Sequence, residues 1–274
     1  MTITKESTKG LPAASTPAKK SHEKLIALGL GGGLIVVGVV IWQFLASAGF
    51  LNTFLTSSPI LVVGSFVEQV ASGSLFSSLA VTAQEFGTGF AISVVVGVTI
   101  GLVMGRYRNA EYAIDPYVWL LYSAPVVALY PLLVLAFGLG QPTVIFICFL
   151  MGVIPIIINT SQGVRNVDQD MIRTAVSFGA REFSILGKVV LPASVPTIMA
   201  GIRLGMGRSL VGVIVGEFFA GNAGIGYNVS YFAGHLDTTG VIAAVVIVVV
   251  IGVLLNSFAI WLEHRADSWR TEIA

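Results

Sequence analysis

Residues 86–104 read FGTGFAISVVVGVTIGLVM, and no charged side chain interrupts them before Arg106 follows. A run of about 20 apolar residues lets one helix cross a hydrocarbon core of ~30 Å. Similar runs lie on both sides of it along the chain. The predicted spans are Leu25–Ala46, Phe86–Met104, Tyr117–Gly138, Thr143–Asn159, Val195–Phe219 and Val241–Leu262. The sequence therefore predicts an all-α membrane protein with six transmembrane helices.

The composition agrees with this assignment. Hydrophobic residues make up 55% of the chain and charged residues 11%, whereas globular proteins carry roughly 25% charged residues. The longest predicted loops are residues 47–85 and 160–194. Each is too short to build a hydrophobic core of its own, so we expect no soluble domain.

The cations are distributed unevenly between the predicted loops. None of the 15 Lys and Arg residues falls in loops 47–85, 139–142 or 220–240. They lie in the leader, in the loops after the second and fourth spans, after the sixth span, and in the first half of the fifth. By the positive-inside rule, both termini are predicted to be cytoplasmic.

The domain boundaries follow from the outermost spans. Residues 1–24 are rich in Lys, Ser, Thr and Pro and are predicted to form a disordered cytoplasmic tail. The run from Leu25 is too long for a signal-peptide core and lacks a small-residue cleavage site, so we expect an uncleaved span. Residues 25–265 form the transmembrane domain, and residues 266–274 form a C-terminal tail. Cys148 is the only cysteine, which excludes a disulfide within the chain.

Small residues recur at helical spacing in two spans. Such residues let helix backbones approach closely inside a bilayer, where lipid offers no hydrophobic drive for association. The pattern fits close packing within one subunit, or an interface between subunits. The residues concerned are Gly89, Ser93, Gly97, Gly101 and Gly105 in the second span, and Gly201, Gly205, Gly212 and Gly216 in the fifth.

Prolines and polar side chains suggest a solute pathway. Proline removes a helix hydrogen bond and bends the helix, which a bilayer tolerates where neighbours or an aqueous cavity satisfy the freed carbonyls. The tyrosines could equally be anchors at the membrane interface. The pathway candidates are Tyr122, Ser123, Pro125, Tyr130, Pro131, Asn159, Arg203 and Glu217.

Charged residues inside the fifth span need an explanation, because exposing a charge to lipid costs at least ~2.5 kcal/mol at the bilayer centre. Arg203 is open to three interpretations: a structural ion pair, snorkelling to the headgroups, or a role in the pathway. Arg208 lies on another face and suggests a contact between subunits. Glu217 is nearer the outer surface, where it could hold the glycine-rich residues 221–226 through their N–H groups.

Loop 160–194 carries clear helix signals. Asp168 can cap a short helix, Asp170 suits its first turn, and Gly179 can adopt the left-handed conformation that ends it. A second short helix is predicted from about Arg181 to Val190, before Pro192. The result is a cytoplasmic helical hairpin. Its first arm carries apolar residues that call for a partner, namely Met171, Ile172, Ala175 and Phe178.

The same loop resembles a known signature. Arg173-Thr174-Ala175, three residues, Gly179, nine residues and Val189-Val190-Leu191-Pro192 resemble the Glu-Ala-Ala, X3, Gly, X9, Ile-X-Leu-Pro motif of ABC importer permeases. Residues 59–265 resemble the nitrate/sulfonate/taurine branch of that family. Further elements of the resemblance are Gly89-Phe90, Ala124-Pro125, Ala128–Leu132, Phe137-Gly138, Pro155–Asn159, Gly163–Asp168, Gly201–Arg203, Glu217 and Gly224–Tyr227.

The resemblance implies a type I ABC importer fold, similar to MetI, in a bacterial inner membrane. It further implies ATPase subunits as partners, a second permease subunit that completes a pore, often as a homodimer, and a periplasmic or lipid-anchored solute-binding protein. The hairpin would be the coupling helix that docks on the ATPase. The implied coupling residues are Asp168, Asp170, Met171, Ile172, Arg173, Ala175, Phe178, Gly179, Leu191 and Pro192.

Two residues depart from the family pattern. Arg173 stands where the family has Glu, which reverses the charge on the coupling helix. Glu85 stands near the outer end of the second span, where relatives commonly carry Arg, and this weakens the inference of an anionic solute.

No catalytic group is predicted in this chain. A Walker sequence is absent, so ATP and Mg²⁺ would be used by the partner ATPase. His22, His235 and His264 have no metal-site spacing, and we expect neither a bound cofactor nor a nucleic-acid partner. Two alternatives remain open: a secondary transporter or channel working without ATP, which predicts inverted repeats, and a structural membrane anchor.

Overall fold

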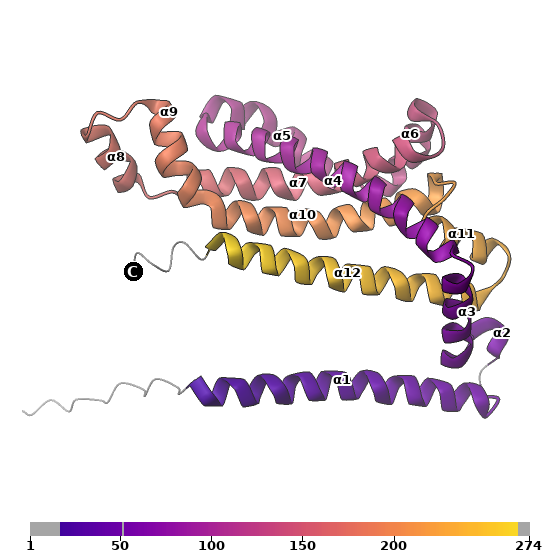
Figure 1. Ribbon diagram of the computed structural model, residues 1–274. Coiled ribbons are helices and arrows are strands. Elements are labelled where there is room, and N and C mark those ends of the chain that lie inside the picture. The colour runs from indigo at the N-terminus through magenta and orange to yellow at the C-terminus, as the bar shows by residue number, and fades with distance from the viewer. Residues whose placement is uncertain (1–16, 51, 268–274) are drawn as a thin grey trace, which may run out of the picture. The chain divides into compact units, whose positions relative to one another are not determined.

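The computed structural model describes residues 17–50 and 52–267 (Figure 1). Residues 1–16 and 268–274, which belong to the predicted tails, lie outside the described residues. The chain divides into two units, residues 1–60 and 61–274. The first unit contains α1 (Pro17–Ser47) and α2 (Thr53–Thr56). Helix α1 therefore begins eight residues before Leu25, the predicted start of the first span.

The second unit is helical throughout its described part. Helix α3 (Pro59–Ala71) straddles the division. The other elements are α4 (Ser74–Arg106), α5 (Arg108–Ser123), the 3-10 turn η1 (Val126–Leu129), α6 (Tyr130–Phe137), α7 (Gln141–Arg165), α8 (Gln169–Ser177), α9 (Glu182–Ile185), the π turn η2 (Leu186–Val190), α10 (Leu191–Ala220), α11 (Ile225–Gly234) and α12 (Thr238–Asp267).

Membrane-spanning helices confirm the predicted fold class. Four described helices are long and apolar enough to cross a membrane, and α5 with its bent continuation through η1 and α6 would make a fifth. The four are Ser74–Arg106, Gln141–Arg165, Glu182–Ala220 and Thr238–Glu263. The predicted first span lies in α1, where only Gly32–Ser47 counts as a described apolar helix. The total of six spans and the side of the termini therefore stay predictions.

The third predicted span, Tyr117–Gly138, is bent in the region of its prolines, as expected, but the bend is sharper than a kink in a continuous helix. The chain bends by 90° between Arg108–Ser123 and Val126–Phe137. Pro125 disfavours helical backbone in the residue before it, and Ala124 is accordingly extended at φ −66° and ψ 133°. The span is thus two helical segments joined at a break.

The second hairpin arm, predicted from about Arg181 to Val190, is helical as α9 and η2, but the prediction that it ends before Pro192 was wrong. Residues 182–220 form one continuous helical rod of 39 residues, here called the α9–α10 rod. Pro192 does not end it, because the π turn η2 makes room: the N–H of Leu191 bonds the carbonyl of Leu186. Pro155 likewise lies inside an unbroken α7. The second span starts at Ser74 rather than Phe86.

Helix α7 packs between α4 and α10, and the small residues lie in both seams. A Cβ added to Gly101 of α4 would lie 2.5 Å from the Cβ of Thr160, and one added to Gly205 of α10 would lie 2.6 Å from Cγ1 of Ile156. Hydroxyls cross the same seams: Ser93 donates to the carbonyl of Phe149 at 3.0 Å. The small-residue stripes therefore pack helices within one subunit.

Candidate docking hairpin and solute pathway

The hairpin after α7 is built from local capping. The side chain of Asp168 accepts a hydrogen bond from the N–H of Asp170 at 2.8 Å, so it caps α8 as predicted. Gly179 ends the helix at φ +76°. Its N–H bonds the carbonyl of Val176, and the N–H of Ala180 bonds that of Ala175, which is the Schellman arrangement. The predicted turn is confirmed.

An apolar cluster fixes the hairpin to the membrane helices. Val164, in the last turn of α7, and Val167, just beyond that helix, are buried together with Val190 of η2. Ile172 of α8 and Ile185 of α9 pack on this cluster and are partly buried. Ile172 therefore anchors the hairpin from inside, and is not part of its exposed apolar surface.

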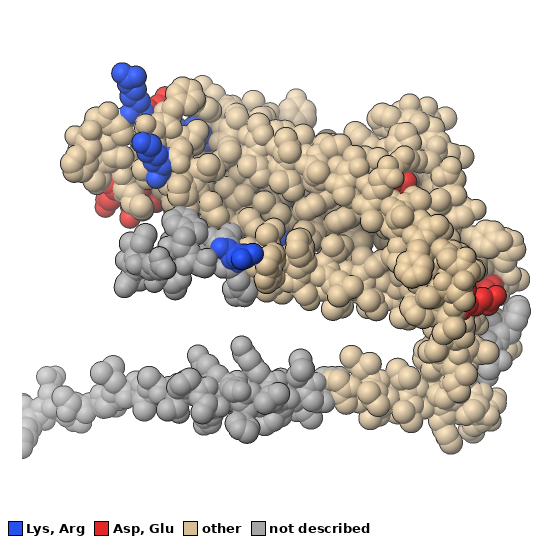
Figure 2. All heavy atoms as spheres, viewed as in Figure 1, with Lys and Arg blue, Asp and Glu red and all other residues tan. Residues whose placement is uncertain are grey.

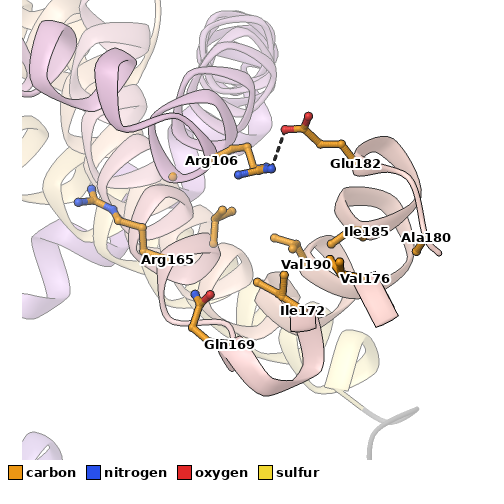
Figure 3. Close-up of a pocket in the computed structure, with 11 residues that line it drawn as sticks. Arg106, Arg165, Gln169, Ile172, Val176, Ala180, Glu182, Ile185 and Val190 are labelled. Carbon is orange, nitrogen blue, oxygen red and sulfur yellow. Dashed lines mark hydrogen bonds and ion pairs between the residues drawn. The ribbon is translucent and has the colours of Figure 1, made fainter. Parts of the chain in front are cut away.

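A pocket of about 490 Å³ opens between the hairpin and the ends of α4 and α7 (Figure 3). Arg106 of α4 donates to Glu182 of α9 at 2.6 Å across it. The apolar wall consists of Ile172, Val176, Ile185 and Val190. The ion pair ties the hairpin to α4, so movement of the hairpin would be transmitted to that span.

The outer surface of the hairpin is apolar and aromatic. Phe178 is 87% exposed and Phe183 is 86% exposed. Met171 and Val176 are also exposed, while Ala175 is partly buried. Phe183 was missed by the sequence analysis, although a second aromatic residue just beyond the Gly179 turn was the available signal. Two fully solvated phenylalanines on one short hairpin indicate a surface that a partner covers.

The other residues that were predicted to couple to an ATPase lie close by. Arg173, where the family has Glu, forms an exposed ion pair with Asp170 at 3.5 Å. Leu191 and Pro192 open α10, where the hairpin joins the rod. On the face drawn in Figure 2, Lys and Arg gather at the end of the unit that carries α8 and α9 and at the end of α12, in line with the predicted cation asymmetry.

The predicted pathway residues are brought together only in part. Tyr122 and Pro125 line a hollow of about 200 Å³ at the break after α5, and Pro155 of α7 lines its opposite side. Arg208 of α10 lines the same hollow, although the sequence analysis assigned it to a subunit contact. This hollow therefore combines the break after α5 with the charged side chain of Arg208.

Four predicted pathway residues have local roles in the described structure. The hydroxyl of Ser123 donates to the carbonyl of Leu120, and the amide of Asn159 donates to that of Pro155. The hydroxyl of Tyr130 donates to the carbonyl of Phe219, which ties α6 to α10. Pro131 lies in the first turn of α6, where a missing N–H costs nothing.

Arg203 and Glu217 lie outside that hollow. Arg203 donates to Glu263 of α12 at 3.2 Å, which supports the structural ion pair among the three interpretations. Glu217 is 0% exposed and accepts a hydrogen bond from the N–H of Gly226 at 2.6 Å. It therefore holds the glycine-rich turn, as the sequence suggested.

Glu85 is 2% exposed and lies beside Glu217. The sequence analysis took it as a charge near the outer end of the second span that weakens the inference of an anionic solute. Because the side chain is buried between α4 and α10, it does not reach the outer surface, and the argument against an anionic solute no longer holds.

Comparison with known proteins identifies close relatives in sequence. Residues 93–268 match the family described as binding-protein-dependent transport system inner membrane component. The putative aliphatic sulfonates transport permease protein SsuC of Bacillus subtilis (strain 168) is 30% identical over 267 residues, covering 97% of both chains. SsuC of Escherichia coli (strain K12) is 34% identical, covering 93% of this chain and 95% of that protein. The bicarbonate transport system permease protein CmpB of Synechococcus elongatus (strain ATCC 33912 / PCC 7942 / FACHB-805) is 31% identical, covering 90% of this chain and 92% of that protein.

Solved structures agree on the fold. A chain from the MetNI methionine ABC transporter in an inward-facing conformation superposes with a TM-score of 0.57 at 18% identity, covering 71% of this chain and 95% of that one. At that identity the likeness concerns the fold alone. The arrangement of helices is that of MetI-type importer permeases.

Proposed function

Because the chain belongs to the family of binding-protein-dependent transport system inner membrane components, we propose that it forms the translocation pathway for a small anionic solute in an ATP-driven importer. The chain is a permease of the inner membrane and not itself an enzyme. We likewise propose that it works with a partner ATPase and a solute-binding protein.

The observation that carries the proposal is the exposed hairpin. Phe178 and Phe183 are almost completely solvated, while the hairpin beneath them is fixed by a buried apolar cluster and the Arg106–Glu182 ion pair. A rigid projection with an aromatic tip suits docking into a groove of another protein. An ATPase subunit is the partner that an importer permease requires at this position.

The continuous rod suggests how the ATPase would act on the pathway. Phe183 lies in the first turn of the α9–α10 rod, and Arg208 and Glu217 lie further along the same helix. When ATP closes the ATPase subunits, a pull on the hairpin would rotate the rod as a rigid body and shift access between the two sides of the membrane. A second permease subunit, identical or similar, would complete the pore.

The anionic solute rests on the relatives. SsuC is named for aliphatic sulfonates and CmpB for bicarbonate, and both solutes are small oxyanions at neutral pH. A binding protein on the outer side would deliver such an anion to the permease. Because Glu85 is buried, its carboxylate does not lie on the outer surface, where it would oppose the entry of an anion.

The test is transport by the reconstituted complex. The permease, its genetically adjacent ATPase and its binding protein are placed in proteoliposomes, and uptake of labelled bicarbonate and ethanesulfonate is measured with ATP on the ATPase side. We expect uptake that requires ATP and stops with a hydrolysis-deficient ATPase. Uptake that proceeds without ATP and follows an ion gradient would favour the secondary transporter instead.

A further inference from the structure

Arg208 lies deep in the membrane domain without a partner. About 18 Å of helix, at ~1.5 Å per residue, separates it from the end of α10 at Ala220, which is more than half of a hydrocarbon core of ~30 Å. Within residues 17–50 and 52–267, its exposed guanidinium makes no hydrogen bond or ion pair. Arg203, five residues earlier in the same helix, is neutralised by Glu263.

An unpaired arginine at this depth cannot face lipid cheaply. Placing Arg at the centre of a spanning helix costs at least ~2.5–3.5 kcal/mol, and such residues face a bundle interior or a water-filled cavity. Arg208 borders two hollows, one of about 200 Å³ against α5, η1 and α7, and one of about 560 Å³ against α12. The exposed Arg208 side chain therefore borders two open hollows that are lined by helices of the membrane domain.

The smaller hollow has a second unusual feature, the break between α5 and η1. Ala124 and Pro125 have extended backbone there, so the helical hydrogen-bond ladder is interrupted. Irregular backbone at membrane depth is tolerated only where protein buries it or where it lines a water-filled cavity. An interrupted helix and an unpaired cation thus meet in one hollow, with the phenol of Tyr122 on its wall.

We propose that this hollow binds the oxyanion group of the transported solute, with the Arg208 guanidinium as its charged donor. The inference rests on the proposed function and adds the residue that selects the solute. A guanidinium presents paired N–H donors that match two oxygens of a bicarbonate, carboxylate or sulfonate group. A hollow of about 200 Å³ accommodates such a group but not a bulky solute, so selection acts on the anionic end.

The first experiment removes the charge in the reconstituted complex. Uptake of bicarbonate and ethanesulfonate, normalised to the amount of co-purified ATPase, should fall roughly tenfold or more in Arg208→Gln and less in Arg208→Lys. The matched control is Arg108→Gln, because Arg108 begins α5, bonds Tyr112 of the same helix and lines neither hollow. Normal uptake by Arg208→Gln would overturn the proposal.

A second experiment remains informative if Arg208→Gln fails to assemble. Arg208→Cys in a Cys148→Ala background is treated with a cationic or an anionic methanethiosulfonate. The cationic adduct should restore uptake and the anionic one should not, and saturating ethanesulfonate or bicarbonate should slow the labelling. A disulfide between two copies, with no protection by either anion, would instead make Arg208 a subunit contact.

The labelling also separates this inference from the proposed function. If the wild-type complex imports neither anion, the proposed solute class has failed. In that case the rate at which Arg208→Cys is labelled is still measured with and without the two anions, because this measurement does not require transport. Absence of protection would overturn the Arg208 site as well, whereas protection would support the site and leave only the direction or coupling of transport in error.

Discussion

The two ends of the α9–α10 rod are built in opposite ways. At its C-terminal end, Glu217 is 0% exposed and the following turn folds back on it, with the N–H of Gly226 bonding its carboxylate at 2.6 Å. The N–H of Ile225 bonds the hydroxyl of Thr82 in α4 at 2.9 Å. At the N-terminal end, Phe183 and its neighbour across the turn, Phe178, project almost fully exposed.

The difference shows which end is complete in a single chain. At the glycine-rich end, Thr82 of α4 and Glu217 of α10 accept hydrogen bonds from the N–H groups of Ile225 and Gly226. At the hairpin end, apolar surface is left uncovered although the hairpin itself is firmly held. We interpret the first as a structural clamp on the spans and the second as a surface that a partner completes.

The largest effect on stability is expected when Gly226 of this clamp is replaced by alanine. A Cβ at Gly226 would overlap the carbonyl of Ile214 and lie 2.8 Å from the Cβ of Glu217. Backbone must move to relieve this, so Gly226→Ala should lower the free energy of unfolding by about 3 kcal/mol or more. The measurement is the thermal unfolding midpoint of the purified protein in detergent.

The matched variant at the other end is Gly179→Ala. A Cβ there would meet nothing within 4 Å, and only the φ of +76° is unfavourable, which costs ~1–2 kcal/mol. Equal losses of unfolding free energy in the two variants would contradict the distinction between the structural clamp at one end and the exposed hairpin at the other.

A smaller difference is expected between two glutamates of the same rod. Glu217→Ala removes a buried acceptor and leaves the Gly226 N–H unpaired, which should cost ~1–3 kcal/mol. Glu182→Ala removes only the half-exposed partner of Arg106 and should cost ~0–1 kcal/mol. Thermal unfolding measures the stability of both variants. A larger loss of stability in Glu182→Ala than in Glu217→Ala would contradict the distinction between the two ends.

The smallest effect on stability is expected at the exposed aromatics. Phe178→Ser and Phe183→Ser should leave the unfolding midpoint unchanged, because neither side chain packs within the chain. Co-purification of the ATPase should nevertheless fall roughly tenfold, as for anchors at the centre of an interface. Phe76→Ser, at another exposed position on α4, is the control and should retain the ATPase.

Local features of this chain could be predicted from sequence. Asp168 and Gly179 decide their own backbone geometry within a few residues, so the capped helix and its left-handed turn were predicted correctly. The membrane fold followed from composition. Pro125 and Pro155 mark the limit: both lie in apolar runs, yet one breaks its helix and the other does not, because tertiary packing decides.

The candidate sites show the same limit. Arg203 and Glu263 pair across 60 residues, and no local pattern connects them. Glu85 was assigned to the outer end of its span because the span was expected to begin at Phe86, whereas α4 begins at Ser74 and buries it. Arg208 could be recognised as unpaired only after every described carboxylate had been located.

Photo-crosslinking tests the central claim most directly. A benzoylphenylalanine placed at Phe183 in the assembled transporter should form one crosslinked product with the ATPase subunit. The same residue at Phe66, an exposed position on α3, should form none with it. A crosslink from Phe183 to a second copy of this chain, or equal crosslinking to the ATPase from both positions, would contradict the assignment of the hairpin as the ATPase-docking surface.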